Sequence, residues 1–347
     1  MLREFNSELY PYSNWVIKRL LTPSNLLSED YNALISMQIE DDTLNFFEMW
    51  NSAGFDLVKA KKEQIIISGM GGSGIGGQLL SAIADLEGFA KISYWNNYDL
   101  PKWADKNCSV ICVSYSGNTA ETLSAAEYAL DAGCKLEVIT TGGKLMEMAE
   151  KNNLHITEIE NGHQPRAALP LLLKALICRI GLPNLDEQIN EVGELSLPLD
   201  KAKDIASQLK GTIPCIYSSD LMNPVAYRWR CQIEENAKQL AFNHQIPEMN
   251  HNEIVGWTLP NNQMSVVLIR DANEKEQISN RFDATKNVAW DNVKIVECIA
   301  EGKTPLARIM SMIILGDLVS LELAKLNNVD PTPVEVIENL KEKLGGK

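Results

Sequence analysis

The chain has 347 residues, of which 45% are apolar and 22% are charged. This composition is ordinary for a globular protein with room for about two domains. Acidic residues outnumber basic residues by 46 to 32, which gives a formal net charge of -14. Such a surface repels polyanions, so we expect neither nucleic acid nor an anionic membrane as a partner. No run approaches the roughly 18 apolar residues that span a bilayer, and the first residues show no signal-peptide pattern.

Seven cysteines are scattered along the chain, most of them within apolar runs. They form no Cys-x-x-Cys pair, and they are not spaced with the four histidines as zinc ligands would be. We therefore expect reduced, buried thiols in a cytoplasmic protein, and no metal site.

Strands and helices are expected to alternate from about residue 64 onward. The residues before that point look helical, and residues 1–45 are taken as a helical N-terminal extension. Apolar runs predict the strands, and apolar residues at helical spacing predict the helices between them. The first series has strands expected at 64–68, 91–95, 109–114 and 135–140, and helices at 74–83, 119–131, 145–151 and 166–180.

A segment with two prolines, residues 182–199, is the best candidate for a domain boundary. The second series has strands expected at 214–218, 264–269 and 293–298, and helices at 223–236, 305–326 and 333–344. Strands separated by helices of this length imply parallel sheets with helices on both faces. The predicted fold class is therefore α/β, with two doubly wound, flavodoxin-like domains in tandem at residues 46–190 and 191–347.

Two loops rich in glycine and hydroxyl residues follow neighbouring apolar strands. The first is GMGGSGIGG at residues 69–77, and the second is SYSGNT at residues 114–119. Backbone without side chains can approach an anion closely, and the helix after each loop points free amides and a positive dipole end at it. A doubly wound sheet brings both loops to one edge, so the pair predicts a pocket for a phosphate group.

The first loop also fits the dinucleotide-binding fingerprint, through Gly69, Gly71 and Gly74. That fingerprint needs an acidic residue at the end of the second strand to bind the ribose hydroxyls. The nearest acid is Asp99, which comes late, in a loop beside Pro101. An NAD site would also leave the second loop without a role, so the phosphate pocket is the favoured interpretation.

Five short motifs carry a resemblance to a known family. GGSG at 71–74 and SYSGNTAET at 114–122 resemble the loops of the sugar isomerase (SIS) domain, whose members bind phosphosugars there. QPR at 164–166, EEN at 234–236 and NHNE at 250–253 follow in order. Together they resemble the bifunctional phosphoglucose/phosphomannose isomerase family, whose members carry two SIS domains. The N-terminal extension is outside this resemblance.

The resemblance implies a cofactor-free enzyme that interconverts glucose 6-phosphate or mannose 6-phosphate with fructose 6-phosphate. The reaction moves a proton between adjacent carbons through a cis-enediolate, and one base can serve both carbons. By the resemblance this base is Glu235; its neighbour Glu234 must face another way on the helix. Arg166 matches the cation that stabilises the enediolate. The alternative for Arg166 is a capping or ion-paired residue at the start of the 166–180 helix.

Three further residues are assigned roles by the resemblance. His251 opens the sugar ring, a task suited to its near-neutral pKa, and reaches the site from the partner subunit of a homodimer. His244 is its nearest competitor. Lys341 assists ring opening, with Lys343 as the alternative. Thr332 is the expected counterpart of a threonine that leaves room for both sugar epimers.

Phosphate binding is expected from residues of both glycine- and hydroxyl-rich loops. The resemblance gives this role to the hydroxyls and backbone amides of Ser114, Ser116, Thr119, Gly71, Gly72 and Ser73. The side chain of Asn118 or Thr119 is also suited to capping the following helix. Both roles can coexist, because a helix N-terminus is itself an anion site.

Two other functions remain open. SIS domains also serve as ligand-reading modules, so a non-catalytic phosphosugar sensor is one alternative. Such sensors usually carry a basic DNA-binding module, and the acidic charge argues against one. The other alternative is an isomerase of a different phosphosugar, such as an amidated or pentose substrate.

Overall fold

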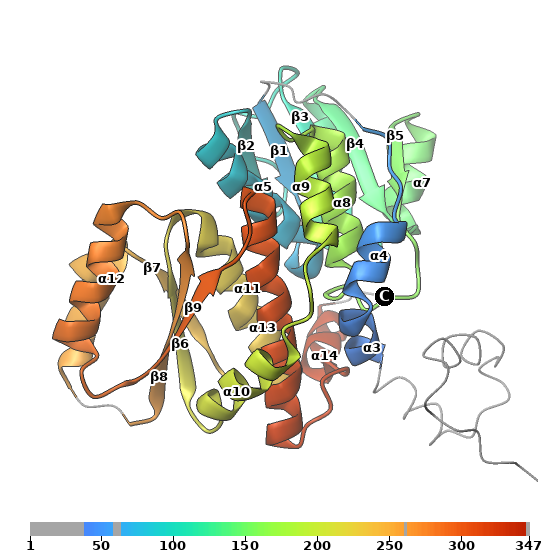
Figure 1. Ribbon diagram of the computed structural model, residues 1–347. Helices are drawn as coiled ribbons and strands as arrows, with labels where there is room; N and C mark the ends of the chain where they lie inside the picture. The colour runs from blue at the N-terminus through green and yellow to red at the C-terminus, as the bar shows by residue number, and fades with distance from the viewer. Residues whose placement is uncertain (1–37, 58–63, 260–261, 345–347) are drawn as a thin grey trace, which may run out of the picture.

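The computed structural model describes residues 38–57, 64–259 and 262–344. They form two parallel sheets that flank a shared layer of helices (Figure 1). Most of the expected N-terminal extension lies outside the described residues. Its last part forms helix α3 (Gln38–Leu44), which is followed by α4 (Phe46–Ser52).

The first sheet has five parallel strands in the order β2-β1-β3-β4-β5. Its elements are β1 (Gln64–Ser68), α5 (Gly71–Glu87), β2 (Lys91–Trp95), β3 (Ser109–Ser114), α6 (Ala120–Asp131), β4 (Lys135–Thr140), α7 (Gly143–Lys151) and β5 (His155–Glu158). The four predicted strands are confirmed. The fifth, β5, is not predicted from the sequence, because it is a short edge strand with exposed polar residues at both ends.

The second sheet has four parallel strands in the order β7-β6-β8-β9. Its elements are α10 (Leu199–Leu209), β6 (Ile213–Ser218), α11 (Asn223–Ala237), β7 (Phe242–Gln245), β8 (Met264–Asp271), α12 (Glu276–Ala289), β9 (Lys294–Ala300), α13 (Pro305–Asn327) and α14 (Glu335–Lys343). Strand β7 and helices α10 and α12 are not predicted from the sequence. Strand β7 buries none of its four residues, so it lacks the apolar signal of a strand.

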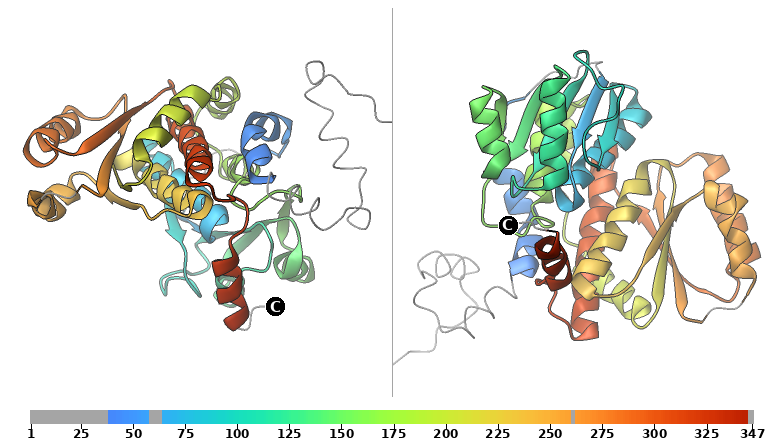
Figure 2. Two further views of the ribbon diagram at one scale, coloured as in Figure 1. Left: turned by 90° about the horizontal axis from the view of Figure 1, so that it is seen from below. Right: turned by 180° about the vertical axis from the view of Figure 1, so that it is seen from behind.

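The two sheets share one apolar core. Helices α5 and α8 (Leu169–Ile180) pack with α11 and α13 in the layer between the sheets (Figure 2). One cluster of buried side chains runs through this layer from Ile67 on β1 to Ile216 on β6 and Val267 on β8. Smaller clusters cover the outer faces under α6 and α7, and under α12. Helices therefore cover both faces of each sheet, which confirms the predicted tandem α/β class.

Helix α8 starts later than the sequence predicts. A helix over 166–180 is expected, but residues 165–167 form a turn and the helix begins at Leu169. Pro170 lies in its first turn, where the missing proline N–H costs nothing because that N–H has no intrahelical partner anyway. Arg166 therefore precedes the helix, and its side chain is held by tertiary contacts.

The proline-containing segment between the halves is partly helical. It holds α9 (Leu185–Gly193), where only a boundary is expected. The carboxylate of Glu191 accepts hydrogen bonds from the backbone N–H groups of Lys303 (2.6 Å) and Thr304 (2.8 Å), just before α13. This segment therefore attaches the first half to the start of α13. The exact boundary at residue 190 stays a prediction.

The described part of the chain contains no helix that is both long and apolar enough to cross a membrane. All seven cysteines are free thiols. Burial raises the pKa of Cys112 and of Cys215 to about 12 in each case, so both stay protonated at neutral pH.

Gly316 lets α13 approach α11 closely. A Cβ at this position would lie within 2.5 Å of three indole atoms of the fully buried Trp229. We expect Gly316→Val to lower the free energy of unfolding by at least about 2 kcal/mol, because the added side chain overpacks the shared layer. Urea unfolding measures this. The control is Gly54→Val, at an exposed site with open space around it, where a change within about 0.5 kcal/mol is expected.

Candidate active site

Two helix N-termini meet at the carboxyl edge of the first sheet. Strands β1 and β3 are adjacent and parallel, and they lead into α5 and α6. Met70 and Thr119 occupy the cap positions, and neither side chain makes a capping hydrogen bond. Both helix ends are therefore available to an anion. Gly71, Gly72 and Ser73 belong to the first turn of α5, which starts three residues earlier than predicted.

The second loop is closed by its own hydroxyls. Ser114 Oγ lies 3.0 Å from Thr119 Oγ1 and accepts a hydrogen bond from Gly117 N at 3.1 Å. Gly117 has φ +67°, and a Cβ there would lie 1.8 Å from the carbonyl oxygen of Gly142, so glycine is required. Ser116, at the tip, is exposed. Its Oγ accepts a hydrogen bond from Asn118 N at 3.3 Å, so Ser114 and Ser116 both shape the loop.

The alternative role of Asn118 as a helix cap is not what the structure shows. Its side chain donates a hydrogen bond to the carbonyl of Ser116 and accepts one from Lys144 N. It therefore connects the loop to α7 and does not cap α6.

The two loops are joined to each other and to Arg166. Ser73 Oγ accepts a hydrogen bond from Tyr115 N at 3.0 Å. A Cβ at Gly72 would lie 2.8 Å from both Arg166 Cα and the carbonyl oxygen of Pro165. Only glycine allows this approach, so the phosphate loop and the candidate catalytic arginine form one site.

The guanidinium of Arg166 is held by fixed acceptors from the second half. Its Nε donates to Asn236 Oδ1 at 2.8 Å, and its Nη2 donates to the carbonyls of Pro331 (2.7 Å) and Thr332 (3.0 Å). Burial lowers the pKa of Arg166, and the carboxylate of Glu235 opposes this shift. The group stays protonated at any relevant pH.

These contacts belong to a closed ring of buried polar groups. Asn236 Nδ2 donates to Ser320 Oγ (2.9 Å), which donates to the carbonyl of Asp317 (2.6 Å). The carboxylate of Asp317 pairs with Arg228 Nη2 at 2.6 Å. Arg228 Nη2 also donates to the carbonyl of Arg166 at 2.9 Å, which closes the ring. Both ends of Arg166 are thereby fixed.

Glu235 faces this arginine and Glu234 does not. Glu235 Oε2 lies 3.9 Å from Arg166 Nε, and its side chain is 30% exposed. Glu234 instead pairs with Arg230, one helical turn earlier, at 3.7 Å. Burial raises the pKa of Glu234, and Arg230 opposes the shift. The geometry therefore favours Glu235 as the carboxylate of the site.

Lys238 is a cation of the site that the sequence analysis misses. It follows α11, and its Nζ donates to the carbonyls of Glu235, Pro331 and Pro333. Partial burial, and then the charge of Arg166, lower the pKa of Lys238. A basic residue at a helix C-terminus is common, so its position alone gives little signal.

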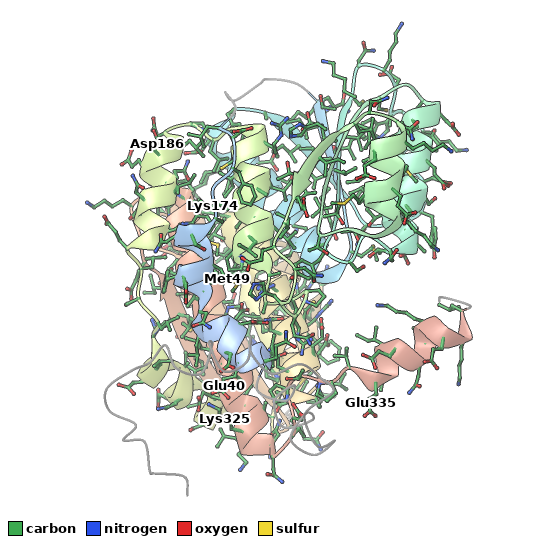
Figure 3. All side chains as sticks on the ribbon, turned by 90° about the vertical axis from the view of Figure 1, so that its right-hand side faces the viewer. Glu40, Met49, Lys174, Asp186, Lys325 and Glu335 are labelled. Atoms are coloured by element: carbon green, nitrogen blue, oxygen red, sulfur yellow. The ribbon has the colours of Figure 1, made fainter. Side chains whose placement is uncertain are left out.

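Thr332 lies beside the guanidinium, but His251 and Lys341 do not. Thr332 is buried, and its N–H donates to Asp330 Oδ1 at 2.9 Å. His251 ends a short 3-10 helix (Glu248–His251) and is exposed. Lys341 is exposed on α14, which buries none of its residues and projects from the body in Figure 3. Among the described residues, neither side chain forms a hydrogen bond or ion pair with Arg166 or Glu235.

Comparison with known proteins gives the family. A family model described as the bacterial phospho-glucose isomerase C-terminal SIS domain matches residues 199–344. A bifunctional phosphoglucose/phosphomannose isomerase from Aquifex aeolicus is 38% identical over 309 residues, covering 86% of this chain and 95% of the relative. One from Caldicellulosiruptor bescii is 40% identical, covering 83% and 91%. The chain belongs to the bifunctional phosphoglucose/phosphomannose isomerase family.

The family membership confirms the resemblance found in the motifs. A solved structure, the C-terminal domain of glucosamine-fructose-6-phosphate aminotransferase from Francisella tularensis, has a TM-score of 0.61 at 15% identity. The match covers 86% of this chain and 96% of the aminotransferase domain. At this identity the likeness concerns the fold alone, and it agrees with two parallel-sheet domains in tandem.

Removing the amide of Asn236 should loosen the arginine. We expect Asn236→Ala to lower the free energy of unfolding by about 1 to 3 kcal/mol, because Arg166 Nε loses its acceptor in a buried site. Ser320→Ala keeps the bond between Arg166 and Asn236 and leaves only a neutral amide N–H unpaired, so a smaller loss is expected. Urea unfolding of both variants measures the difference. Equal costs would show that the Arg166–Asn236 bond contributes nothing.

Proposed function

We propose that this protein is a cofactor-free aldose-ketose isomerase. Its substrates are glucose 6-phosphate and mannose 6-phosphate, each interconverted with fructose 6-phosphate. The curated relatives are named as bifunctional phosphoglucose/phosphomannose isomerases. The observation that carries the proposal is the carboxylate of Glu235 beside the buried Arg166, next to two uncapped helix N-termini.

Glu235 is the proposed base. It removes the proton from one carbon of the open-chain sugar and returns it to the neighbouring carbon. Its partial exposure supports this role, because the carboxylate can reach a ligand. Its pairing with Arg166 keeps the carboxylate close to the place where negative charge develops.

Arg166 is the proposed cation for the enediolate oxygen. Its Nε and Nη2 atoms are occupied by protein acceptors. Within the described ranges Nη1 has no hydrogen-bond partner, so it is the donor proposed to meet substrate. Donors fixed in advance stabilise developing charge without reorganising during the reaction.

The phosphate group is proposed to bind at the N-termini of α5 and α6. Backbone amides of Gly71 and Gly72, with the hydroxyls of Ser73, Ser116 and Thr119, would bind its oxygens. Gly72 is in contact with the backbone of Arg166. A phosphate bound here therefore places the rest of the sugar near that residue.

We also propose a homodimer with shared active sites, in which His251 opens the ring bound by the partner subunit. Lys341 assists it, and Thr332 adjoins the sugar. Support comes from the exposure of His251 and of α14, both of which are available to a second copy. The seven free cysteines support a cytoplasmic location, because thiols stay reduced in the cytoplasm. The proposed reaction would place the enzyme in glycolysis and gluconeogenesis.

Replacing the proposed base tests the reaction. We expect Glu235→Gln to lower kcat for isomerisation of fructose 6-phosphate by at least about 100-fold, with binding of the sugar phosphate nearly unchanged. Coupled assays measure turnover and calorimetry measures binding. The matched control is Glu234→Gln, which should stay within about threefold of the wild type. Wild-type protein that binds phosphosugars without turnover would favour the sensor.

Mixed dimers test the sharing of active sites. Glu235→Gln and His251→Ala are each expected to inactivate the homodimer. A heterodimer purified with two different tags has one intact site if His251 acts across the interface, so about half of the wild-type rate is expected. An inactive heterodimer would show that both residues act within one subunit.

A further inference from the structure

The short helix α3 contacts the segment that leads into Arg166. Asp42 is only 8% exposed, and both of its carboxylate oxygens are used. Oδ1 lies 3.0 Å from His163 Nδ1, and Oδ2 accepts a hydrogen bond from Gln164 N at 2.9 Å. One carboxylate therefore holds two consecutive residues of the chain, two and three positions before Arg166.

A second side chain of α3 binds the same segment. Gln38, one helical turn before Asp42, donates a hydrogen bond from Nε2 to the carbonyl of Gly162 at 2.6 Å. Ile39 packs with Ala167, the residue after Arg166, and with Leu321 of α13. Contacts from α3 thus lie on both sides of Arg166 in the sequence.

Helix α3 is itself fixed to the central layer. Glu40 Oε1 forms an ion pair with Lys325 Nζ of α13 at 2.7 Å, and Figure 3 shows the two side chains next to each other. Because α13 also carries Asp317 and Ser320 of the polar ring, one helix supports Arg166 from two directions.

His163 connects this segment to the phosphate loop. Its backbone N–H donates to Tyr115 Oη at 3.0 Å, and Tyr115 Oη donates to the carbonyl of Glu160 at 3.0 Å. Tyr115 belongs to the second loop and binds Ser73 of the first through its own N–H. His163 is therefore the junction between α3, the segment before Arg166 and both phosphate loops.

We propose that Asp42, through His163 and Gln164, is a positioning residue that aligns Arg166 with the phosphate site. This proposal rests on the proposed role of Arg166. It adds that helix α3 supports the position of that arginine. Neither Asp42 nor His163 touches substrate. They act by fixing the backbone from which the guanidinium extends, and a displacement of about 1 Å at such a group can cost about 100-fold in rate.

The charge of His163 follows from its surroundings. The hydrogen bond with Asp42 raises the pKa of His163, and burial opposes this shift. Glu160 on the same segment also raises it, Arg166 is a nearby cation, and Tyr115 is neutral because burial raises its pKa to about 12. The ion pair is therefore present below the raised pKa of His163 and is lost as the pH rises through it.

The experiment compares Asp42→Asn with Glu48→Gln, which removes one carboxylate charge from an exposed side chain of the next helix, α4. We expect D42N to lower kcat about tenfold with KM within about twofold, because Arg166 acts on the transition state. E48Q should retain kcat within about twofold. The ratio of wild-type to D42N kcat should be largest below the pKa of His163 and should shrink above it.

A second readout needs no activity. NMR titration of the four histidines, assigned with His163→Gln, should give a His163 pKa above 6.5 in the wild type and a lower one in D42N. A wild-type kcat in D42N would overturn the proposal, and so would an unchanged His163 titration. If D42N does not fold, H163Q takes its place in the rate comparison.

Arg166→Ala separates this proposal from the proposed function. A wild-type rate in R166A would remove the catalytic role of Arg166. A loss of about 100-fold or more in R166A, with a wild-type rate in D42N, would overturn the role of Asp42 alone.

Discussion

A buried guanidinium needs fixed acceptors, and this constraint organises the site. Removing the charge of Arg166 from water is costly, so most of its N–H groups and its carbonyl must be paired in the folded protein. Asn236 and the carbonyl of Thr332 supply acceptors, while Arg228 donates to the backbone. The arginine comes from the first half and these partners come from the second. Tandem organisation is thus a requirement of the site itself.

The proposed phosphate site differs from the surroundings of Arg166, because its helix N-termini are left without side-chain caps. Around Arg166 almost every polar atom is satisfied, whereas the N-termini of α5 and α6 lack side-chain caps. An uncapped N-terminus forgoes about 1 kcal/mol of stability. A dianion bound at the proposed phosphate site would recover that stability, without a lysine or arginine in the loops. A net charge of -14 is compatible with an anionic substrate for this reason.

Local signals predicted most of the fold and part of the site. Strands with continuous apolar runs, such as β1, were predictable because burial on both faces leaves a clear pattern. Edge strand β7 was not predictable, because it buries none of its residues. The start of α8 was not predictable either, because it depends on a proline in the first turn of the helix. Motifs indicated Arg166 and Glu235. The contacts of Lys238 and Asp42 depend on residues about 90 and 120 positions away, which no local pattern encodes.

The single core shared by the sheets limits how the protein can move and evolve. Because α5, α8, α11 and α13 fill one layer, the halves cannot swing apart like the lobes of a hinged enzyme. For the same reason we expect neither half to be stable as a separate polypeptide, because its apolar side of the layer would be exposed and prone to aggregation. A gene-fission event in this lineage would have to be followed by immediate reassembly of the fragments.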